Sequence, residues 1–326
     1  MMCGPLLRRA AHHPVVYTWD YFVQELVNGL TLGSVYALIA LGYSMVYGIL
    51  KLLNFAHGEV YMIGAFIGYG VLTVSGGAAD PMFPIWLLIS FMFIAAMIGS
   101  GLLGVVIERF AYRPLRNAPR IAPLISALGV SFFLQNTALL LFSADFRSYD
   151  TFSLDNGTLF THGIHSGPLN ISLIRIIVIV TTAALMVALT LFVSRTRLGK
   201  AMRATAYDRE AAAMMGIDVD RVIVVTFFIG SALAGAAGVM VGLVFQRVYH
   251  FMGFVAGLKG FTAAVVGGIG SIPGAMLGGI VIGLAEAFST GYLSSTFQDL
   301  IVFGILIVVL IVRPTGLLGK ADIKKV

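Results

Sequence analysis

Three polar residues lie close together in the stretch "LLNFAHGEVYMIGAF": Asn54, His57 and Glu59. Histidine and glutamate can bind metal ions or carry protons, and a metalloprotease helix presents them as His-Glu-x-x-His. The order His57-Gly58-Glu59 does not supply that pattern, so we expect no metal ion here. Ionisable groups in apolar segments are costly and usually face a cavity or a partner. The cluster is therefore either part of a solute pathway or a polar cap between the first two spans.

A glycine-rich stretch, residues 264–288, raises the question of a nucleotide site. A Walker loop requires Gly-Lys followed by Ser or Thr. Alanine follows both Gly-Lys pairs of this chain, at 199–200 and 319–320. The pattern G-x-G-x-x-G fails as well, because Pro273 occupies the place of its third glycine. We therefore expect that the chain itself binds no ATP and needs no cofactor.

The same glycines fit a membrane helix better. Gly270, Gly274 and Gly278 recur at every fourth position, which lines small residues along one helical face and lets a second backbone approach closely. Pro273 lacks an amide donor and interrupts the helical hydrogen bonds. We predict a discontinuous helix that packs against the protein interior. Such helices often mark a transport path, and tight packing with a kink explains the pattern equally well.

The other polar residues in or next to the apolar segments are expected to have structural roles. Gln135 and Asn136 lie in the middle of one such segment and are expected to hydrogen-bond across helices. Lys259 and Glu286 bracket the glycine-rich stretch, where long side chains can extend to the membrane surface. The chain has no G-x-S-x-G motif, no paired carboxylates within the membrane, and only one cysteine, Cys3. We expect no enzymatic activity.

The elements that carry these residues are membrane-spanning helices. The 326 residues have a mean hydropathy of +0.95, and only 11% of them are charged, against about 25% in soluble domains. Seven uncharged stretches are close to the roughly 20 residues that a helix needs to cross the hydrocarbon core. The stretch 300–312 reaches that length if it extends back toward residue 293. We predict an all-α, polytopic transmembrane helical bundle of eight or nine spans with a broken glycine-rich helix. The seven stretches are 26–50, 60–79, 81–107, 121–144, 176–194, 222–246 and 260–285.

Basic residues set the expected orientation. Because lysine and arginine favour cytoplasmic loops, the two loops that hold ten of the 21 face the cytoplasm, and the connection 143–174 faces outward. The distribution also argues against nucleic acid as a partner. Eight spans would leave the basic tail 320–326 outside, whereas nine would not, if residues 248–288 cross twice. We divide the chain into a non-conforming leader, 1–21, which lacks the apolar core of a signal peptide, a transmembrane domain, 22–319, and that tail. The ten basic residues are Arg109, Arg113, Arg116, Arg120, Arg195, Arg197, Lys200, Arg203, Arg209 and Arg221.

The second basic loop, 195–221, has helical character. Residues 204–215 are rich in helix formers, and Gly216 is placed as the stop of this helix. Ala204, Tyr207, Ala211 and Met214 would lie on one small apolar face. A short amphipathic helix of mixed charge can lie on lipid or dock into a groove of a partner, and this composition favours the groove.

Five collinear motifs now resemble one family, the LivH-type permease of bacterial branched-chain amino-acid ABC importers. The resemblance covers about residues 22–326 and ends in "RPTGLLG". It implies a multi-pass inner-membrane permease that works with a second homologous permease, two cytoplasmic ATPases and a periplasmic substrate-binding protein. The five motifs are "NGLTLGSVYALIALGYSMVYGI", "NFAHGEVYMIGAF", "AYRPLR", "MGIDVDRVIVVTFFIGSALAGAAG" and "GLKGFTAAVVGGIGSIPGAMLGGIVIGLAEA".

The resemblance also implies that residues 203–216 form the coupling helix that meets an ATPase. The expected coupling residues are Arg203, Ala204, Tyr207, Asp208, Ala211, Ala212 and Gly216. The candidate pathway or packing residues are Asn54, His57, Glu59, Gln135, Gly270, Pro273, Gly274 and Gly278.

Other functions remain open at this point. An ion-coupled secondary transporter would need a coupling-ion site and a carboxylate within the membrane, and none of the seven uncharged stretches supplies one. A membrane scaffold would need no pathway at all. Related permeases for urea and amides also look similar, so the sequence does not identify the solute.

Overall fold

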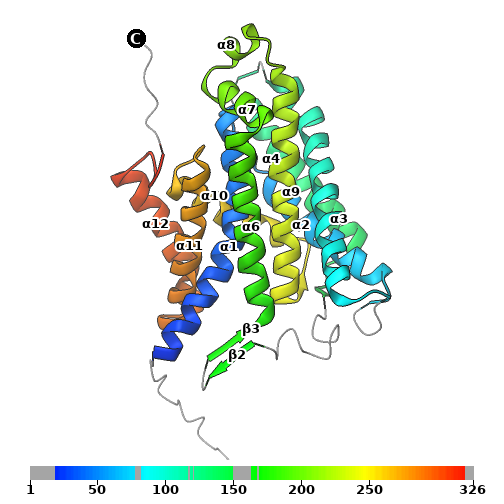
Figure 1. Cartoon of the computed structure of the whole chain (residues 1–326), viewed down its shortest axis with the longest axis vertical. Coiled ribbons are helices and arrows are strands. Elements are labelled where there is room, and N and C mark those ends of the chain that lie inside the picture. The colour runs from blue at the N-terminus through cyan, green and yellow to red at the C-terminus, as the bar shows by residue number, and fades with distance from the viewer. Residues whose placement is uncertain are drawn as a thin grey trace, which may run out of the picture.

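Apolar helices that run between two ends of the molecule dominate the fold (Figure 1). The computed structural model describes residues 19–77, 82–116, 118–119, 121–149, 163–166 and 169–319. Within them the prediction of an all-α, polytopic bundle is confirmed, and the strands form two short antiparallel pairs, β1–β4 and β2–β3. Most of the expected leader and the whole tail 320–326 lie outside the described residues. The elements are α1 (Trp19–Leu50), α2 (His57–Val74), α3 (Ile85–Ile107), η1 (Glu108–Tyr112), η2 (Arg113–Leu115), α4 (Ile121–Phe142), β1 (Arg147–Ser148), β2 (Gly163–Ser166), β3 (Leu169–Ser172), α6 (Leu173–Arg195), α7 (Arg197–Tyr207), α8 (Arg209–Met214), α9 (Val219–Phe245), β4 (Arg247–Val248), α10 (Met252–Gly267), α11 (Ile272–Tyr292), η4 (Ser295–Phe297) and α12 (Gln298–Val312).

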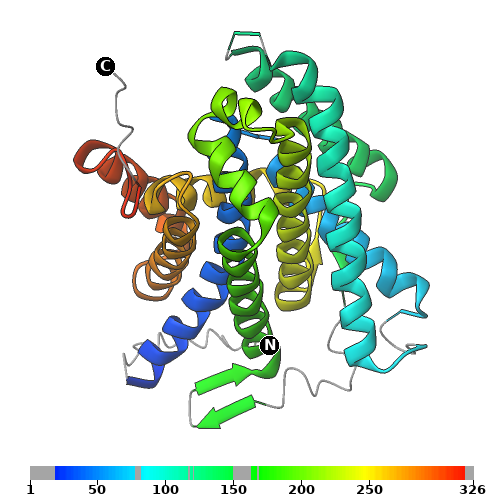
Figure 2. The same cartoon turned by 45° about the horizontal axis from the view of Figure 1, so that its top comes forward.

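Two long helices, α1 and α9, form the centre of the bundle. Helix α1 packs on α9, α10 and α11, and α9 packs on α2 and α3. Figure 2 shows α3 and α12 at opposite flanks, with α1 and α9 between them. The most apolar 18-residue window is 83% buried in α1 but 17% buried in α6 and 6% in α12. The outer helices therefore present apolar side chains that suit lipid, while α1 and α9 pack against protein.

The number of spanning helices is slightly lower than predicted. Seven described helices are long and apolar enough to cross a membrane, whereas eight or nine were expected. The difference lies in α2 and α10, which have 18 and 16 residues. Both begin inside the bundle after a non-helical segment. Helix α10 is too short to cross the hydrocarbon core, whereas α2 has the length of a short span but starts with the polar residues His57 and Glu59.

The basic loops gather at one end of the molecule. Figure 1 shows α7 and α8 at the end where the C-terminus leaves, and the start of α1 at the other end with β2 and β3. The Arg209 guanidinium donates to the Ile49 carbonyl at the end of α1, Nε to O 2.9 Å. Past α12, the Leu317 amide donates to the Val266 carbonyl at the end of α10 (2.9 Å). We call the end that holds α7 and α8 the basic end, and the end that holds the start of α1 the outer end.

The glycine-rich stretch is discontinuous, as predicted, but it breaks at a different place. Helix α10 ends at Gly267, and the break contains Gly268 and Gly270 with φ of 111° and 87°. Gly270 therefore does not share a helical face with Gly274, which corrects the expected repeat. Pro273 lies in the first turn of α11, where a missing amide donor costs nothing. The proline starts a helix here and does not kink one.

The close approach expected at the glycines is confirmed. A Cβ atom on Gly274 would overlap the Gly267 carbonyl, and one on Gly278 would overlap the Ala263 carbonyl, both in α10. On α1, a Cβ on Gly33 would lie 2.8 Å from the Ile280 Cα atom. Glycine thus lets α11 pack backbone to backbone against both α10 and α1.

Candidate functional site

Two helices begin in the interior and meet at their first turns. A Cβ on Gly58 of α2 would overlap the Gly253 carbonyl of α10 and lie 2.9 Å from the Gly257 Cα atom. From this contact α2 runs toward the outer end, where Gly68 packs on Tyr149, and α10 runs toward the basic end. We call the contact between residues 57–59 and residues 252–257 the half-helix junction.

Glu59 is the buried carboxylate of the junction. It is 1% exposed, and its Oε1 atom accepts hydrogen bonds from Ser131 Oγ (3.2 Å) and Gln135 Nε2 (3.3 Å) of α4. Its Oε2 atom lies next to Gly253 and has no hydrogen-bond partner among the described residues. The predicted cross-helix bond of Gln135 is confirmed, whereas Asn136 donates to the Phe132 carbonyl of its own helix, so that prediction is wrong.

The other two residues of the sequence cluster point to different partners. The His57 ring is buried and packs edge-on against Tyr43 with 4.8 Å between ring centroids. The Asn54 Oδ1 atom accepts a hydrogen bond from the Tyr112 hydroxyl, 3.1 Å away. Within the described chain, no three His, Cys, Asp or Glu residues are arranged to hold a metal ion. The three residues therefore support the start of α2, and Glu59 provides one buried carboxylate.

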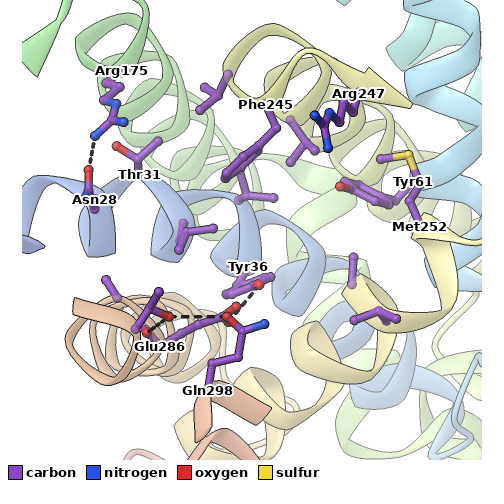
Figure 3. Close-up of a pocket in the computed structure, with 18 of the residues that line it drawn as sticks. Asn28, Thr31, Tyr36, Tyr61, Arg175, Phe245, Arg247, Met252, Glu286 and Gln298 are labelled. Atoms are coloured by element: carbon purple, nitrogen blue, oxygen red, sulfur yellow. Dashed lines mark hydrogen bonds between the residues drawn. The ribbon is translucent and has the colours of Figure 1, made fainter. Parts of the chain in front are cut away.

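A cavity of about 560 Å³ reaches the junction from the outer end (Figure 3). Its outer part is lined by the first turns of α1, at Glu25 and Asn28, and by Arg247 beyond α9. Its inner part reaches Tyr61 of α2 and Met252 of α10, beside the junction. Gly270, Pro273, Gly274 and Gly278 do not line it. The apolar walls are Leu32, Val35, Val241, Val244, Val255 and Ala256.

Charged side chains of both signs stand on the walls of this cavity. Arg175 of α6 donates to the Asn28 side chain of α1, and Glu25 lies close enough to attract its charge. In Figure 3, Arg175 and Arg247 lie on the opposite side of the cavity from Glu286. No sequence pattern indicated Glu25, Asn28, Arg175 or Arg247, because each stands singly near the end of a span. No spacing rule indicates that they share one cavity.

Lys259 and Glu286 form a buried ion pair, which corrects the expectation that both extend to the membrane surface. The Lys259 Nζ atom lies 2.7 Å from Glu286 Oε1 and 2.9 Å from Asp299 Oδ1. The second oxygen of Glu286 accepts a hydrogen bond from the Tyr36 hydroxyl at 2.9 Å. This network joins α1, α10, α11 and α12 at the cavity wall.

At the basic end, the predicted single helix 204–215 is wrong in its extent. Helix α7 ends at Tyr207, and Asp208 caps α8 by accepting hydrogen bonds from the Glu210 and Ala211 amides, both 3.1 Å. Aspartate at this position starts a new helix more readily than it continues one. Gly216 has a φ of 79°, which suits its expected role as the stop.

The expected coupling residues occupy different environments. Tyr207 is more than 80% exposed, whereas Ala212 is buried against its own chain. Met214 and Met215, which are outside the expected set, are also more than 80% exposed. The Arg203 guanidinium donates to the Val193 carbonyl. Burial and the nearby charge of Arg116 lower the pKa of Arg209, although an arginine stays protonated in proteins. Helix α8 therefore presents an apolar tip, with Met214 and Met215, on an arginine-anchored base.

An ion cluster holds the two basic loops together. Arg116 pairs with both Glu108 and Asp220, and the Arg113 Nη2 atom lies 2.6 Å from Asp220 Oδ2. Glu108 is fully buried, so its pairing offsets a large desolvation cost. The cluster connects η1 and η2 to the start of α9, directly after α8.

Comparison with known proteins identifies a family of transport permeases. Residues 25–310 match the family described as "Branched-chain amino acid transport system / permease component". The chain is 47% identical to the high-affinity branched-chain amino acid transport system permease protein LivH of Salmonella typhimurium, over 94% of this chain and 98% of that protein. It is 46% identical to BraD of Pseudomonas aeruginosa (96% and 100% covered) and 26% identical to LivM of Escherichia coli (92% and 72% covered), both described as permease proteins of such systems. The chain belongs to the family of permease components of branched-chain amino acid transport systems.

Proposed function

We propose that this chain is the membrane-spanning permease of an ABC importer that carries branched-chain amino acids across the bacterial inner membrane. One observation carries the proposal beyond family membership: a cavity open at the outer end stops at two helices that begin inside the bundle. Discontinuous helices line the substrate sites of many transporters. Irregular backbone at membrane depth is tolerated only against protein or a water-filled path.

The proposed path has an open half and a closed half. A solute released at the outer end enters the cavity and reaches Tyr61 and Met252. Beyond them the backbone contact between Gly58 and Gly253 blocks the way to the basic end. Because α2 and α10 begin at this contact, a shift of either helix separates them without unwinding a continuous span.

In this proposal, partner proteins supply the energy for the helix shift. The chain has no Walker loop, and α8 carries an exposed apolar tip at the basic end. Two cytoplasmic ATPases would bind at such tips, one on this chain and one on a second homologous permease, and a periplasmic binding protein would deliver the solute. The LivM relative supports the existence of that second permease. Lipid would contact α3, α4 and α6, whose apolar side chains point outward.

An ion-coupled secondary transporter is the second candidate, and Glu59 is the observation that favours it. A carboxylate with an unpartnered oxygen inside the bundle could bind a proton or a sodium ion. The hydrogen bonds from Ser131 and Gln135 favour a structural role instead, because they already stabilise the other oxygen. The energy source distinguishes the two candidates.

Uptake of radiolabelled leucine by proteoliposomes tests the proposal. The complete complex with its binding protein should take up leucine when ATP is inside, with no proton or sodium gradient. An uptake that requires an ion gradient and persists without ATP would support the secondary transporter. Uptake of urea or a simple amide, with none of leucine, isoleucine or valine, would overturn the proposed solute class.

A further inference from the structure

We propose that the outer cavity binds its solute as a zwitterion, with the ammonium group at Glu286 and Tyr36 and the carboxylate at Arg247. This inference rests on the proposed function and adds to it a site for the solute within the permease itself. The charges of Glu286 and Arg247 make the permease selective for α-amino acids, in addition to any selection by a binding protein.

The wall formed by α11 carries an excess of negative charge. Lys259 is shared between two carboxylates, at 2.7 Å from Glu286 Oε1 and 2.9 Å from Asp299 Oδ1. One ammonium group against two carboxylates leaves a formal charge of −1 on this group of three residues. Glu286 is the member that lines the cavity, and its Oε2 atom is held by the Tyr36 hydroxyl. A cationic ligand group is attracted to this point, and more strongly than in water because the surroundings have a low dielectric constant.

The opposite wall carries an unbalanced positive charge. Arg247 is exposed at the cavity and makes no ion pair with a described residue. Arg175, the other basic residue of the cavity, is already held by Asn28 and faces the charge of Glu25. A guanidinium group presents paired donors that match both oxygens of a carboxylate.

Only a zwitterion balances both walls. An uncharged solute such as urea leaves two unbalanced charges beside it, and an anion or a cation leaves one, each with a desolvation cost. The cavity is also lined by apolar side chains, which suit an aliphatic side chain of the solute: Leu32, Val35, Val241 and Val244. The volume of about 560 Å³ lies within the usual range for small-molecule sites, roughly 300–1,000 Å³.

Equilibrium binding of tritiated L-leucine tests the inference, with the purified permease–ATPase complex and no binding protein. The competitors are L-leucinamide, which lacks the carboxylate, and 4-methylpentanoate, which lacks the ammonium group. Leucine should bind saturably, and each competitor should bind about tenfold more weakly, because each loses one charged hydrogen bond.

Arg247→Gln should remove the preference over L-leucinamide. Asp299→Asn should remove the preference over 4-methylpentanoate while the Lys259–Glu286 pair remains. Arg313→Gln, which removes an exposed charge at the basic end, should change nothing.

Two results would overturn the inference without touching the proposed function. One is the absence of saturable leucine binding to a complex that still takes up leucine with its binding protein. The other is unchanged preference in both Arg247→Gln and Asp299→Asn. If the complete complex takes up no branched-chain amino acid, the proposed function itself fails.

Discussion

Gly58 at the start of α2 and Gly253 at the start of α10 lie backbone to backbone, closer than any side chain would permit. The two helices leave this contact toward opposite ends of the molecule. The outer cavity reaches their first turns, so in the proposed path backbone atoms, and not bulky side chains, form the closure. Glycine at both positions is what allows the closure.

Gly58→Leu should prevent the junction from closing. The added side chain overlaps the Gly253 carbonyl, and overpacking of this kind costs about 1–3 kcal/mol or more. We expect loss of leucine uptake together with a lower melting temperature of the purified complex. Gly70→Leu is the matched control, because a Cβ at this position of the same helix meets nothing within 4 Å. Normal uptake by Gly58→Leu would mean that the junction does not close the path.

Gly278→Leu should lower the yield of the assembled protein. A Cβ there overlaps the Ala263 carbonyl in the contact between α10 and α11, which has no room for a side chain. Purification yield and thermal stability measure the effect. Gly304→Leu in α12 should be tolerated, because its surroundings are open. Equal yields of the two variants would contradict the packing seen here.

Lys259→Met should destabilise the protein more than removal of the whole ion pair does. The substitution leaves Glu286 buried beside a second carboxylate, and an unpaired buried charge costs about 3–5 kcal/mol. The double variant Lys259→Met/Glu286→Met replaces both charges with apolar groups and should recover much of that loss. Thermal unfolding of the three purified proteins checks the order. A double variant less stable than Lys259→Met would refute this account of the pair.

Met214→Glu should release an ATPase from the complex. Met214 forms the exposed tip of α8, and a charge buried there in an apolar groove lacks a partner. We expect normal membrane insertion and pairing with the second permease, but reduced co-purification of ATPase and no uptake. Leu293→Glu makes the same kind of change on an exposed residue near the outer end and should retain both ATPases. Full ATPase content in Met214→Glu would remove α8 from the coupling site.

The sequence predicts the helices and their close contacts well, because apolar length and glycine spacing act locally. It predicts less of the cavity, because that site depends on residues far apart in the chain. Glu286 and Lys259 were expected to extend to the surface separately, but the packing of α10 on α11 turns them toward each other. The break between α7 and α8 was missed because Asp208 was placed inside one predicted helix, residues 204–215, although aspartate is also a good helix cap.

The most direct test of the path is the accessibility of a single cysteine at the inner end of the cavity. The chain has one native cysteine, Cys3, so Ala256→Cys can be introduced into a Cys3→Ser background. In proteoliposomes of one orientation without ATP, a membrane-impermeant thiol reagent should label residue 256 from the outer end and not from the basic end. Labelling only from the basic end, or none under conditions that label Thr31→Cys nearer the mouth, would contradict an outward-open cavity that stops at Gly58 and Gly253.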